Sequence, residues 1–193
     1  MIDLLAAHRD LLERRRGQMN LVGPGPVDPH YDDATLGLEG LDLVGRWADL
    51  GSGAGFPGIV LAARFPQVAL DLVEAREKRS TFLEAVLGAA RLAVRARPAP
   101  LRVVRGRVED LPSGVYDGVV ARAFAPPDEV AAHADRLLVP GGRLLLFLQH
   151  DQAGPAGWSV EREVAYTLEG RQRRTLLLQR AASAPAIPAA TGS

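Results

Sequence analysis

Residues 47–58 read W-A-D-L-G-S-G-A-G-F-P-G, and this stretch decides the fold. An apolar run ends at Asp49 and Leu50, and three glycines follow at every second position. A glycine-rich turn between a strand and a helix lets the backbone approach a ligand closely. The glycine stretch can be aligned with two different cofactor-binding motifs. From Gly53 the stretch fits the G-x-G-x-x-G of dinucleotide-binding folds, and from Asp49 it suggests a site for the methyl donor S-adenosylmethionine.

The end of the strand favours the second register. In a dinucleotide fold the first glycine stands directly after the strand, and here that turn begins at Gly51. Pro57 has a fixed φ and no N–H, which suits the first turn of the helix that follows. A carboxylate at Asp49 is unfavourable beside a pyrophosphate but favourable beside the ammonium and sulfonium groups of S-adenosylmethionine. A glycine-rich turn without any cofactor is the plainer alternative.

A second carboxylate ends the next predicted strand. Glu74 follows Gly55 by 19 residues and comes at the end of the apolar run ALDLVE. A carboxylate at this place can accept two hydrogen bonds from ribose hydroxyls. Because either cofactor contains a ribose, Glu74 predicts a nucleoside site without choosing between the two registers.

Strand and helix patterns alternate along the rest of the chain, which predicts βαβ units and a parallel sheet. The predicted parallel strands are residues 46–50, 69–74, 101–105, 116–121 and 143–148, and an antiparallel pair follows at 163–168 and 175–180. The predicted helical segments are residues 2–20, 29–43, 57–64, 77–90 and 128–138. We expect the α/β fold of class I methyltransferases, Rossmann-like, with a mostly parallel seven-stranded sheet. Residues 1–45 would form an N-terminal helical cap, 46–180 the methyltransferase domain, and 181–193 a disordered tail.

Composition excludes several classes of function. The chain has 193 residues and no cysteine, so disulfides, thiolate metal sites and thiol nucleophiles are excluded. The formal net charge is zero, which by itself predicts no nucleic-acid or membrane partner. No apolar run is long enough to cross a bilayer, and the N-terminus lacks the pattern of a signal peptide. We expect a cytoplasmic monomer with no metal and no membrane partner.

Four segments together resemble a known family. In chain order they are the glycine stretch, EAREKRSTFLE, RGRVEDLP and YDGVVARAFA, and they are similar to segments of the glucose-inhibited division protein B family. Its members are bacterial methyltransferases that modify guanine N7 in small-subunit ribosomal RNA. The resemblance covers roughly residues 20–180. It implies S-adenosylmethionine as the cofactor and ribosomal RNA, or the small ribosomal subunit, as the partner.

The resemblance also implies the residues of a cofactor site. Gly51 and Phe56 match loop positions that touch the methionine part, and Val108 and Glu109 match the pair beside the adenine. Arg122 matches the arginine of the family's R-A-F motif, at the end of the fourth strand. The complete predicted set is Asp49, Gly51, Gly53, Phe56, Glu74, Val108, Glu109 and Arg122.

Two positions depart from the family's pattern. Its His-x-x-Asp-Ser segment reads HYDDA here, so His30 and Asp33 are kept but Ala34 replaces the serine. The fifth strand ends with Leu148 where the family has a lysine. His30 and Asp33 are the only candidates for acid–base roles, and no other catalytic residue is assigned. Guanine N7 carries a lone pair and no proton, so its methylation requires no base.

Three arginine clusters are candidates for phosphate contact, at residues 14–16, 95–97 and 171–174. Each cluster alone is equally consistent with a solvated surface. Two other functions stay open at this point: a small-molecule methyltransferase on the same scaffold, and a nucleotide-binding module without catalysis.

Overall fold

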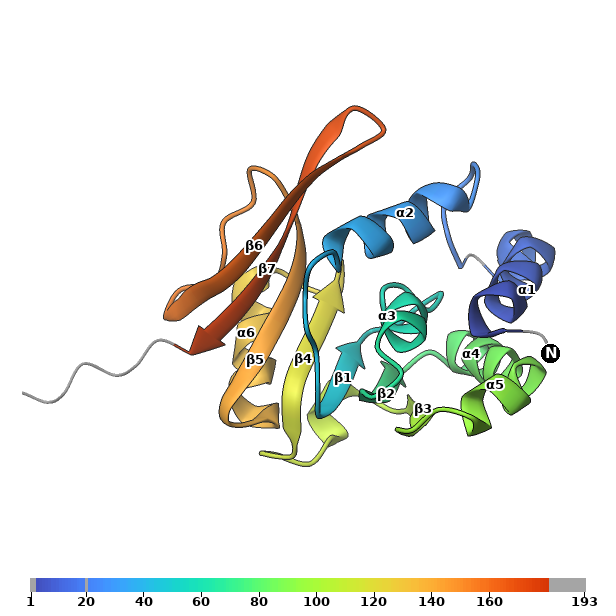
Figure 1. The fold of residues 1–193 in the computed structure, drawn as a ribbon, viewed down its shortest axis with the longest axis horizontal. Helices are drawn as coiled ribbons and strands as arrows, with labels where there is room; N and C mark the ends of the chain where they lie inside the picture. The colour runs from blue at the N-terminus through green and yellow to red at the C-terminus, as the bar shows by residue number, and fades with distance from the viewer. Residues whose placement is uncertain (1–2, 20, 181–193) are drawn as a thin grey trace, which may run out of the picture.

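A seven-stranded sheet forms the centre of the computed structural model, which describes residues 3–19 and 21–180 (Figure 1). The strands are ordered β3-β2-β1-β4-β5-β7-β6. The pairs among β1 to β5 are parallel, and β7 runs antiparallel to both β5 and β6. This confirms the predicted sheet, including its closing antiparallel pair. The predicted tail at 181–193 lies outside the described residues, and the domain bounds stay predictions.

Three strands have the predicted ends and four are longer than predicted. The bounds are β1 (Arg46–Leu50), β2 (Ala69–Glu74), β3 (Leu101–Arg105), β4 (Tyr116–Arg122), β5 (Leu138–Gln149), β6 (Trp158–Leu168) and β7 (Arg171–Arg180). Strand β5 runs through Pro140 and two glycines, which the sequence pattern marks as a turn. Its pairing with β4 shifts register between Tyr116 and Gly118, and this irregularity accommodates the extra residues.

The helices are α1 (Leu4–Met19), α2 (Asp28–Gly37), α3 (Gly58–Arg64), α4 (Glu77–Ala89), α5 (Arg91–Arg95) and α6 (Pro127–Leu137), with a 3₁₀ turn η1 (Val108–Asp110). The two short elements α5 and η1 were not predicted. Helix α2 ends at Gly37 rather than near residue 43, because residues 38–40 form a turn and the chain from 41 to 45 is neither helix nor strand. Pro57 stands at the N-cap of α3, as the glycine stretch led us to expect.

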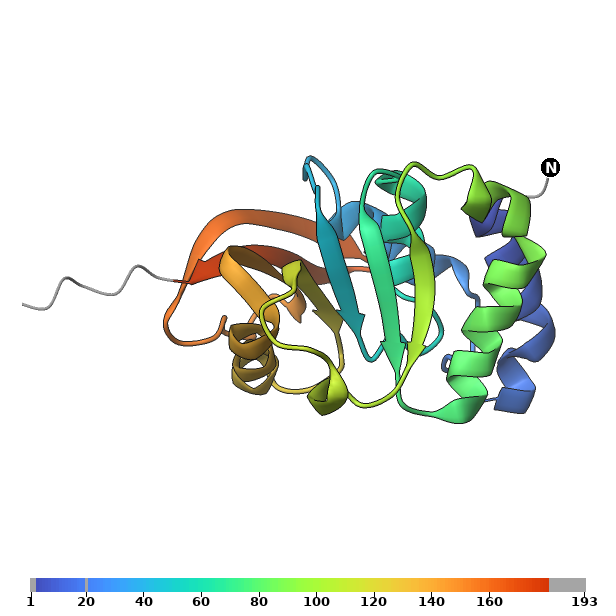
Figure 2. The same ribbon diagram turned by 90° about the horizontal axis from the view of Figure 1, so that it is seen from below.

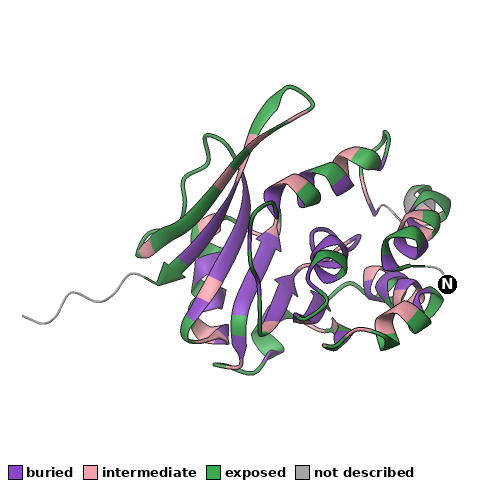
Figure 3. Ribbon diagram, viewed as in Figure 1, coloured by how far each residue is buried: buried purple, intermediate pink, exposed green. Residues whose placement is uncertain are grey.

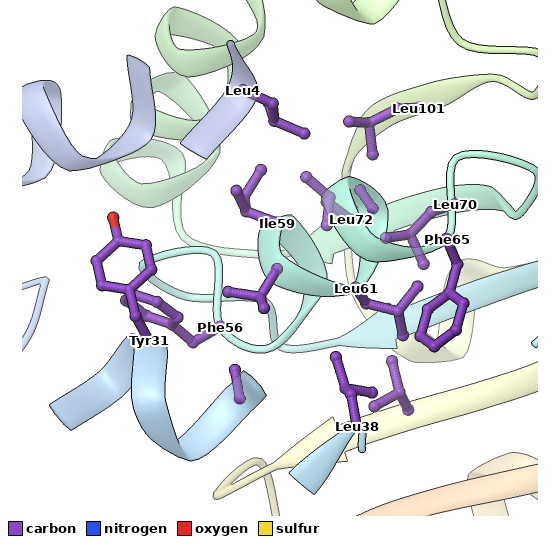
Figure 4. Close-up of a cluster of buried hydrophobic side chains, with 14 of the residues drawn as sticks. Leu4, Tyr31, Leu38, Phe56, Ile59, Leu61, Phe65, Leu70, Leu72 and Leu101 are labelled. Atoms are coloured by element: carbon purple, nitrogen blue, oxygen red, sulfur yellow. The ribbon is translucent and has the colours of Figure 1, made fainter. Parts of the chain in front are cut away.

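Apolar side chains fill both sides of the sheet, so the central strands are buried (Figure 3). Along β1, Trp47 belongs to the cluster that includes residues of α1 to α4, and its neighbours Ala48 and Leu50 belong to the cluster under α6. Figure 4 shows the first cluster, in which Tyr31 of α2 and Phe56 of the loop before α3 lie against each other. The alternation along β1 is the period of two that a strand with two covered faces requires.

The parallel strands place their carboxyl ends along one edge of the sheet (Figure 2). The loop that follows β1, residues 51–56, is called the glycine loop below. Helices α1 and α2 both pack against α3, which follows this loop. The N-terminal helices therefore lie behind the glycine loop, and the loops after β2, β3 and β4 lie along the same edge. Open α/β sheets bind their ligands at this edge.

Candidate functional site

A cleft of about 710 Å³ opens at the carboxyl ends of β1, β2 and β3. Small-molecule pockets in proteins measure roughly 300–1,000 Å³, so the cleft has room for a nucleoside cofactor. Four residues of the predicted cofactor set line it: Gly51, Glu74, Val108 and Glu109. They come from the loop after β1, the end of β2 and the 3₁₀ turn η1, and the fold brings these three places together; their contact with a cofactor stays a prediction.

Glu74 ties the end of β2 to the glycine loop. The residue is only 5% exposed, and its Oε2 accepts the Gly53 N–H at 3.0 Å while its Oε1 accepts the Arg76 N–H at 2.7 Å. Each carboxylate oxygen can accept a further hydrogen bond. The carboxylate is therefore fixed in direction and still able to accept from two hydroxyl groups.

Replacing Glu74 with alanine is expected to weaken S-adenosylmethionine binding by about 10- to 100-fold, the range for losing a buried, charged hydrogen-bond partner. Isothermal titration measures the affinity. Glu77→Ala is the matched control, because Glu77 lies on the neighbouring helix and makes an exposed ion pair with Arg105 at 3.2 Å. If Glu74→Ala bound the cofactor with the same affinity as the wild type, Glu74 would not be a cofactor-binding residue.

Gly51 is required by both conformation and space. Its φ is +67°, a backbone conformation that residues other than glycine rarely adopt. A Cβ at this position would lie 2.4 Å from Cδ2 of Phe124. Two backbone hydrogen bonds also hold the loop. The Ser52 N–H donates to the Val73 carbonyl of β2 at 2.9 Å, and the Gly55 N–H donates to the Ser52 carbonyl within the loop at 2.7 Å.

Asp49 lies beneath the glycine loop and does not line the cleft. It is 1% exposed, and neither carboxylate oxygen has a hydrogen-bond partner among the described residues. The nearby Ser52 hydroxyl donates to the main-chain oxygen of Asp49 instead, at 3.0 Å. Burial raises the pKa of Asp49 to about 6, against smaller lowering effects from Ser52 and Arg122. A direct contact between Asp49 and a cofactor stays a prediction.

A second pocket, of about 320 Å³, adjoins the cleft on the side of β4 and β5. Both catalytic candidates, His30 and Asp33, line it. Further lining side chains are Arg122, Leu148, Tyr166 and Arg173. The cleft and this second pocket share Ala123 and Phe124. The loop after β4 therefore forms the partition between them, and Ala123 in this loop has a φ of +53°.

Asp33 joins three parts of the chain in the second pocket. Its Oδ2 accepts from Arg122 Nη1 at 2.8 Å, and its Oδ1 accepts from the Tyr166 hydroxyl at 2.9 Å. Burial raises the pKa of Tyr166, and the hydroxyl remains a donor. Because its carboxylate forms an ion pair with the Arg122 guanidinium, Asp33 holds Arg122 rather than serving as a free base. Tyr166, which stands 133 positions after Asp33 in the chain, was not among the predicted site residues.

His30 is half-buried and stacks on the Phe56 ring, with the centroids 5.5 Å apart. Burial and the nearby Arg122 cation lower the pKa of His30. The Phe56 side chain faces α1 and α2, where Tyr31 meets it edge-on at 4.8 Å. The Arg122 guanidinium lies 5.1 Å from the same ring. Phe56 thus packs against two side chains that line the second pocket, His30 and Arg122. Its contact with the methionine part of a cofactor stays a prediction.

The three arginine clusters do not share one surface. Helices α1 and α5 lie at one end of the molecule, whereas the β6–β7 pair lies at the other (Figure 1). Arg97 donates to the carbonyls of Ala62, Val68 and Ala99, which is a structural role. Of the three clusters, residues 171–174 lie beside the site, where Arg173 lines the second pocket.

Within the described ranges, 3–19 and 21–180, no group of three or more His, Cys, Asp or Glu side chains could hold a metal ion. Across the same part of the chain, no helix has both the length and the apolar character needed to cross a bilayer.

Comparison with known proteins gives a consistent family. The model of the GidB family, described as rRNA small subunit methyltransferase G, matches residues 5–157. A protein of that name from Salinispora arenicola is 35% identical over 166 residues, which cover 80% of this chain and 66% of the relative. Another, from Nitratidesulfovibrio vulgaris strain DP4, is 36% identical over 184 residues, which cover 86% and 79%. The chain thus spans about two thirds of the length of the Salinispora relative.

Solved structures share the fold at low sequence identity. TrmN from Thermus thermophilus is 20% identical with a TM-score of 0.53, and the match covers 88% of this chain and 53% of TrmN. A mutant of MtNAS in complex with S-adenosylmethionine is 13% identical with a TM-score of 0.61, covering 93% and 75%. These likenesses confirm the predicted class I methyltransferase fold. With the family model matching most of its length, the chain belongs to the rRNA small subunit methyltransferase G family, the family that the sequence resembled.

Proposed function

We propose that this chain is an S-adenosylmethionine-dependent methyltransferase that transfers a methyl group to guanine N7 of 16S ribosomal RNA. The observation that carries the proposal is the pair of pockets that meet at Ala123 and Phe124. One contains an oriented carboxylate, Glu74, and the other contains two arginines, Arg122 and Arg173. Such a substrate implies a cytoplasmic protein, and the small ribosomal subunit would be its partner.

The residues of the larger cleft suit the cofactor. When bound, S-adenosylmethionine supplies a methyl group on a positively charged sulfur. Glu74 would accept hydrogen bonds from the ribose hydroxyls, and Val108 and Glu109 would lie beside the base. Gly51 keeps the floor of the cleft open, because a larger side chain would meet Phe124. Asp49, Gly53 and Phe56 would lie behind the cleft. Asp49 would contribute its negative charge, and Gly53 and Phe56 would support the glycine loop.

The residues of the second pocket suit an acceptor that needs no base. Asp33 is paired with the Arg122 cation and accepts from Tyr166, and burial lowers the pKa of His30, which favours its neutral form. Because guanine N7 has no proton to lose, the protein has only to place the base and exclude water. Arg122 and Arg173 would bind a phosphate or the acceptor edges of the guanine, and Asp33 would hold Arg122 in the direction that this requires.

One observation favours a second candidate, a small-molecule acceptor. Leu148 lines the second pocket at the position where the family has a lysine, so this wall is apolar. An apolar wall suits a small aromatic substrate better than an RNA phosphate. The neutral overall charge agrees with this alternative.

The test is methylation of RNA with a labelled donor. The protein is incubated with S-adenosylmethionine and either 16S ribosomal RNA or small ribosomal subunits from cells that lack this methylation. Mass spectrometry of the nucleosides is expected to show labelled 7-methylguanosine, and Glu74→Ala is the control with impaired cofactor binding. Binding of S-adenosylmethionine without label in either RNA would contradict the RNA acceptor. Binding of NAD instead would contradict the methyltransferase assignment itself.

A further inference from the structure

Helix α1 carries a histidine that is fully buried behind the glycine loop. His8 is 0% exposed, its Nε2 lies 2.6 Å from the carbonyl oxygen of Ala54, and its Nδ1 lies 2.7 Å from the hydroxyl oxygen of Tyr31. Its ring meets Phe56 edge-on at 5.0 Å and contacts Phe82 at 5.9 Å. The histidine thus touches α2, α4 and the glycine loop at once.

The two hydrogen bonds assign the tautomer of this ring. A carbonyl oxygen can only accept, so Nε2 carries the proton and donates it to Ala54. The neutral ring then has a lone pair on Nδ1, which accepts the hydroxyl proton of Tyr31. Both ring nitrogens are used, and Tyr31 fixes the tautomer that the bond to Ala54 requires.

Two consecutive loop residues are consequently held from opposite sides. Glu74 accepts the Gly53 N–H from the side of the cleft, at 3.0 Å, and His8 donates to the Ala54 carbonyl from the side of the helices. The contact continues at Gly55, where a Cβ would lie 3.0 Å from His8 Nε2. No residue of α1 or α2 lines the larger cleft among the described residues, yet α1 holds the loop that does.

We propose that His8 is a positioning residue: through Ala54 it fixes the glycine loop in the conformation that receives the cofactor, and Tyr31 holds it in the donating tautomer. The identity of the ligand, S-adenosylmethionine, rests on the proposed function. Nothing in the family resemblance assigns a role to this position. The proposal gives the N-terminal helices a part in cofactor affinity as well as in covering the sheet.

Few charged groups face His8, so its titration can be interpreted. On α1, Arg9 lies over the Tyr31 ring at 4.3 Å, and from α2 His30 stacks on Phe56. From β4, Arg122 lies near the same Phe56 ring, while α4 and the loop contribute aromatic rings and backbone. Burial, and to a smaller extent Arg9, lowers the pKa of His8 to about 4. His8 is therefore neutral at ordinary pH, as the donating tautomer requires.

The test compares four proteins by titration with S-adenosylmethionine: the wild type, His8→Leu, His8→Gln and Tyr31→Phe. His8→Leu removes the donor and is expected to raise Kd by about 10-fold, the effect of one lost buried hydrogen bond. His8→Gln places an amide N–H2 near the position of Nε2 and is expected to bind within about 3-fold of the wild type. Tyr31→Phe keeps the aromatic ring but removes the hydroxyl, and its Kd is expected to lie between those of His8→Leu and His8→Gln.

A readout without cofactor separates this inference from the proposed function. Hydrogen exchange of the Gly53 and Gly55 amides in the unliganded protein is expected to be about 10-fold faster in His8→Leu and unchanged in His8→Gln. The Leu72 amide in the core of β2 is the internal control, because general destabilisation would speed it too. If His8→Leu fails to fold, Tyr31→Phe takes its place in the exchange measurement.

The outcomes are distinct. If the wild type does not bind S-adenosylmethionine but loop exchange rises in His8→Leu, the proposed function fails and the loop role stands. If all variants bind equally and exchange equally, His8 does not position the loop. The pH profile adds a second comparison. Protonation of Asp49 is expected to lower the cofactor affinity of the wild type and of His8→Gln alike as pH falls through about 6. Below about pH 5 the wild type is expected to lose further affinity that His8→Gln keeps, because protonation of Nδ1 breaks the bond to Tyr31.

Discussion

Valine at position 51 is expected to abolish S-adenosylmethionine binding, with Kd raised by at least about 100-fold, which corresponds to about 3 kcal/mol. Two effects add. A β-branched residue is strained at a φ of +67°. The Cβ, which would lie 2.4 Å from Phe124 Cδ2, also has to displace the partition between the two pockets. Titration of the purified Gly51→Val protein with the cofactor measures the loss.

Gly114 provides the matched control for this substitution. Its φ is +64°, and a Cβ there would meet nothing within 4 Å. Gly114→Val therefore carries the same backbone strain without the collision, and it is expected to lower stability while leaving cofactor affinity near that of the wild type. If Gly51→Val bound the cofactor as well as Gly114→Val does, the cleft would not be the cofactor site.

The sequence was sufficient where local pattern determines structure. Strands β1, β2 and β3 are short apolar runs between turn residues, and their predicted ends agree with the structure. Glu74 was recognisable for the same reason, since its place at the end of such a run puts it at the ligand-binding edge. Within β5 the local signal was misleading: Pro140 marks a turn in most sequences, but the irregular pairing with β4 allows the strand to include it.

Contacts between distant residues explain what sequence could not predict. Arg122 and Asp33 were both candidates, yet nothing in the sequence paired two residues 89 positions apart. Tyr166 and His8 were not singled out, because each matters through a partner from another element. Gly37 ends α2 where a Cβ would strike Phe147 at 2.4 Å, a tertiary contact without a local signal.

Asp49→Asn is expected to stabilise the unliganded protein by about 1–2 kcal/mol at pH 7.5, which is unusual for a substitution at a fully buried position. A pKa raised from 3.8 to about 6 corresponds to a cost of about 3 kcal/mol for keeping the carboxylate ionised. The asparagine amide also lacks partners, so only part of that cost is recovered. Urea unfolding of both proteins across pH measures the difference.

The sign of the pH dependence follows from the raised pKa. Asp49 contributes stability that is fully present below pH 3.8 and is lost as pH rises through about 6. His8 acts in the opposite direction: with its pKa lowered to about 4, it contributes stability that is present above pH 6.5 and is lost as pH falls toward 4. Since both titrate in the wild type, only the difference between wild type and Asp49→Asn isolates Asp49. That difference is expected to shrink by about 2 kcal/mol between pH 7.5 and pH 4, so that Asp49→Asn becomes the less stable protein near pH 4.

Asp71 is the control for this prediction, because it is a buried carboxylate on the adjacent strand with the opposite surroundings. Burial alone would raise the pKa of Asp71, but hydrogen bonds from Arg102, Arg46 and Tyr116 outweigh that effect and hold the pKa below its usual range. Asp71→Asn is therefore expected to destabilise the protein at pH 7.5. If both asparagine variants were destabilised alike, the unpartnered state of Asp49 would be contradicted.

A carboxylate kept buried at a cost to stability needs a functional reason. Asp49 is the penultimate residue of β1 and is buried beneath the glycine loop, where its negative charge favours a cationic ligand above it. Asp49→Asn is accordingly expected to weaken S-adenosylmethionine binding by about 10-fold or more while raising the free energy of unfolding. A pure packing residue would change both quantities in the same direction. If the more stable variant bound the cofactor as tightly as the wild type, Asp49 would have no part in recognising the positive charge.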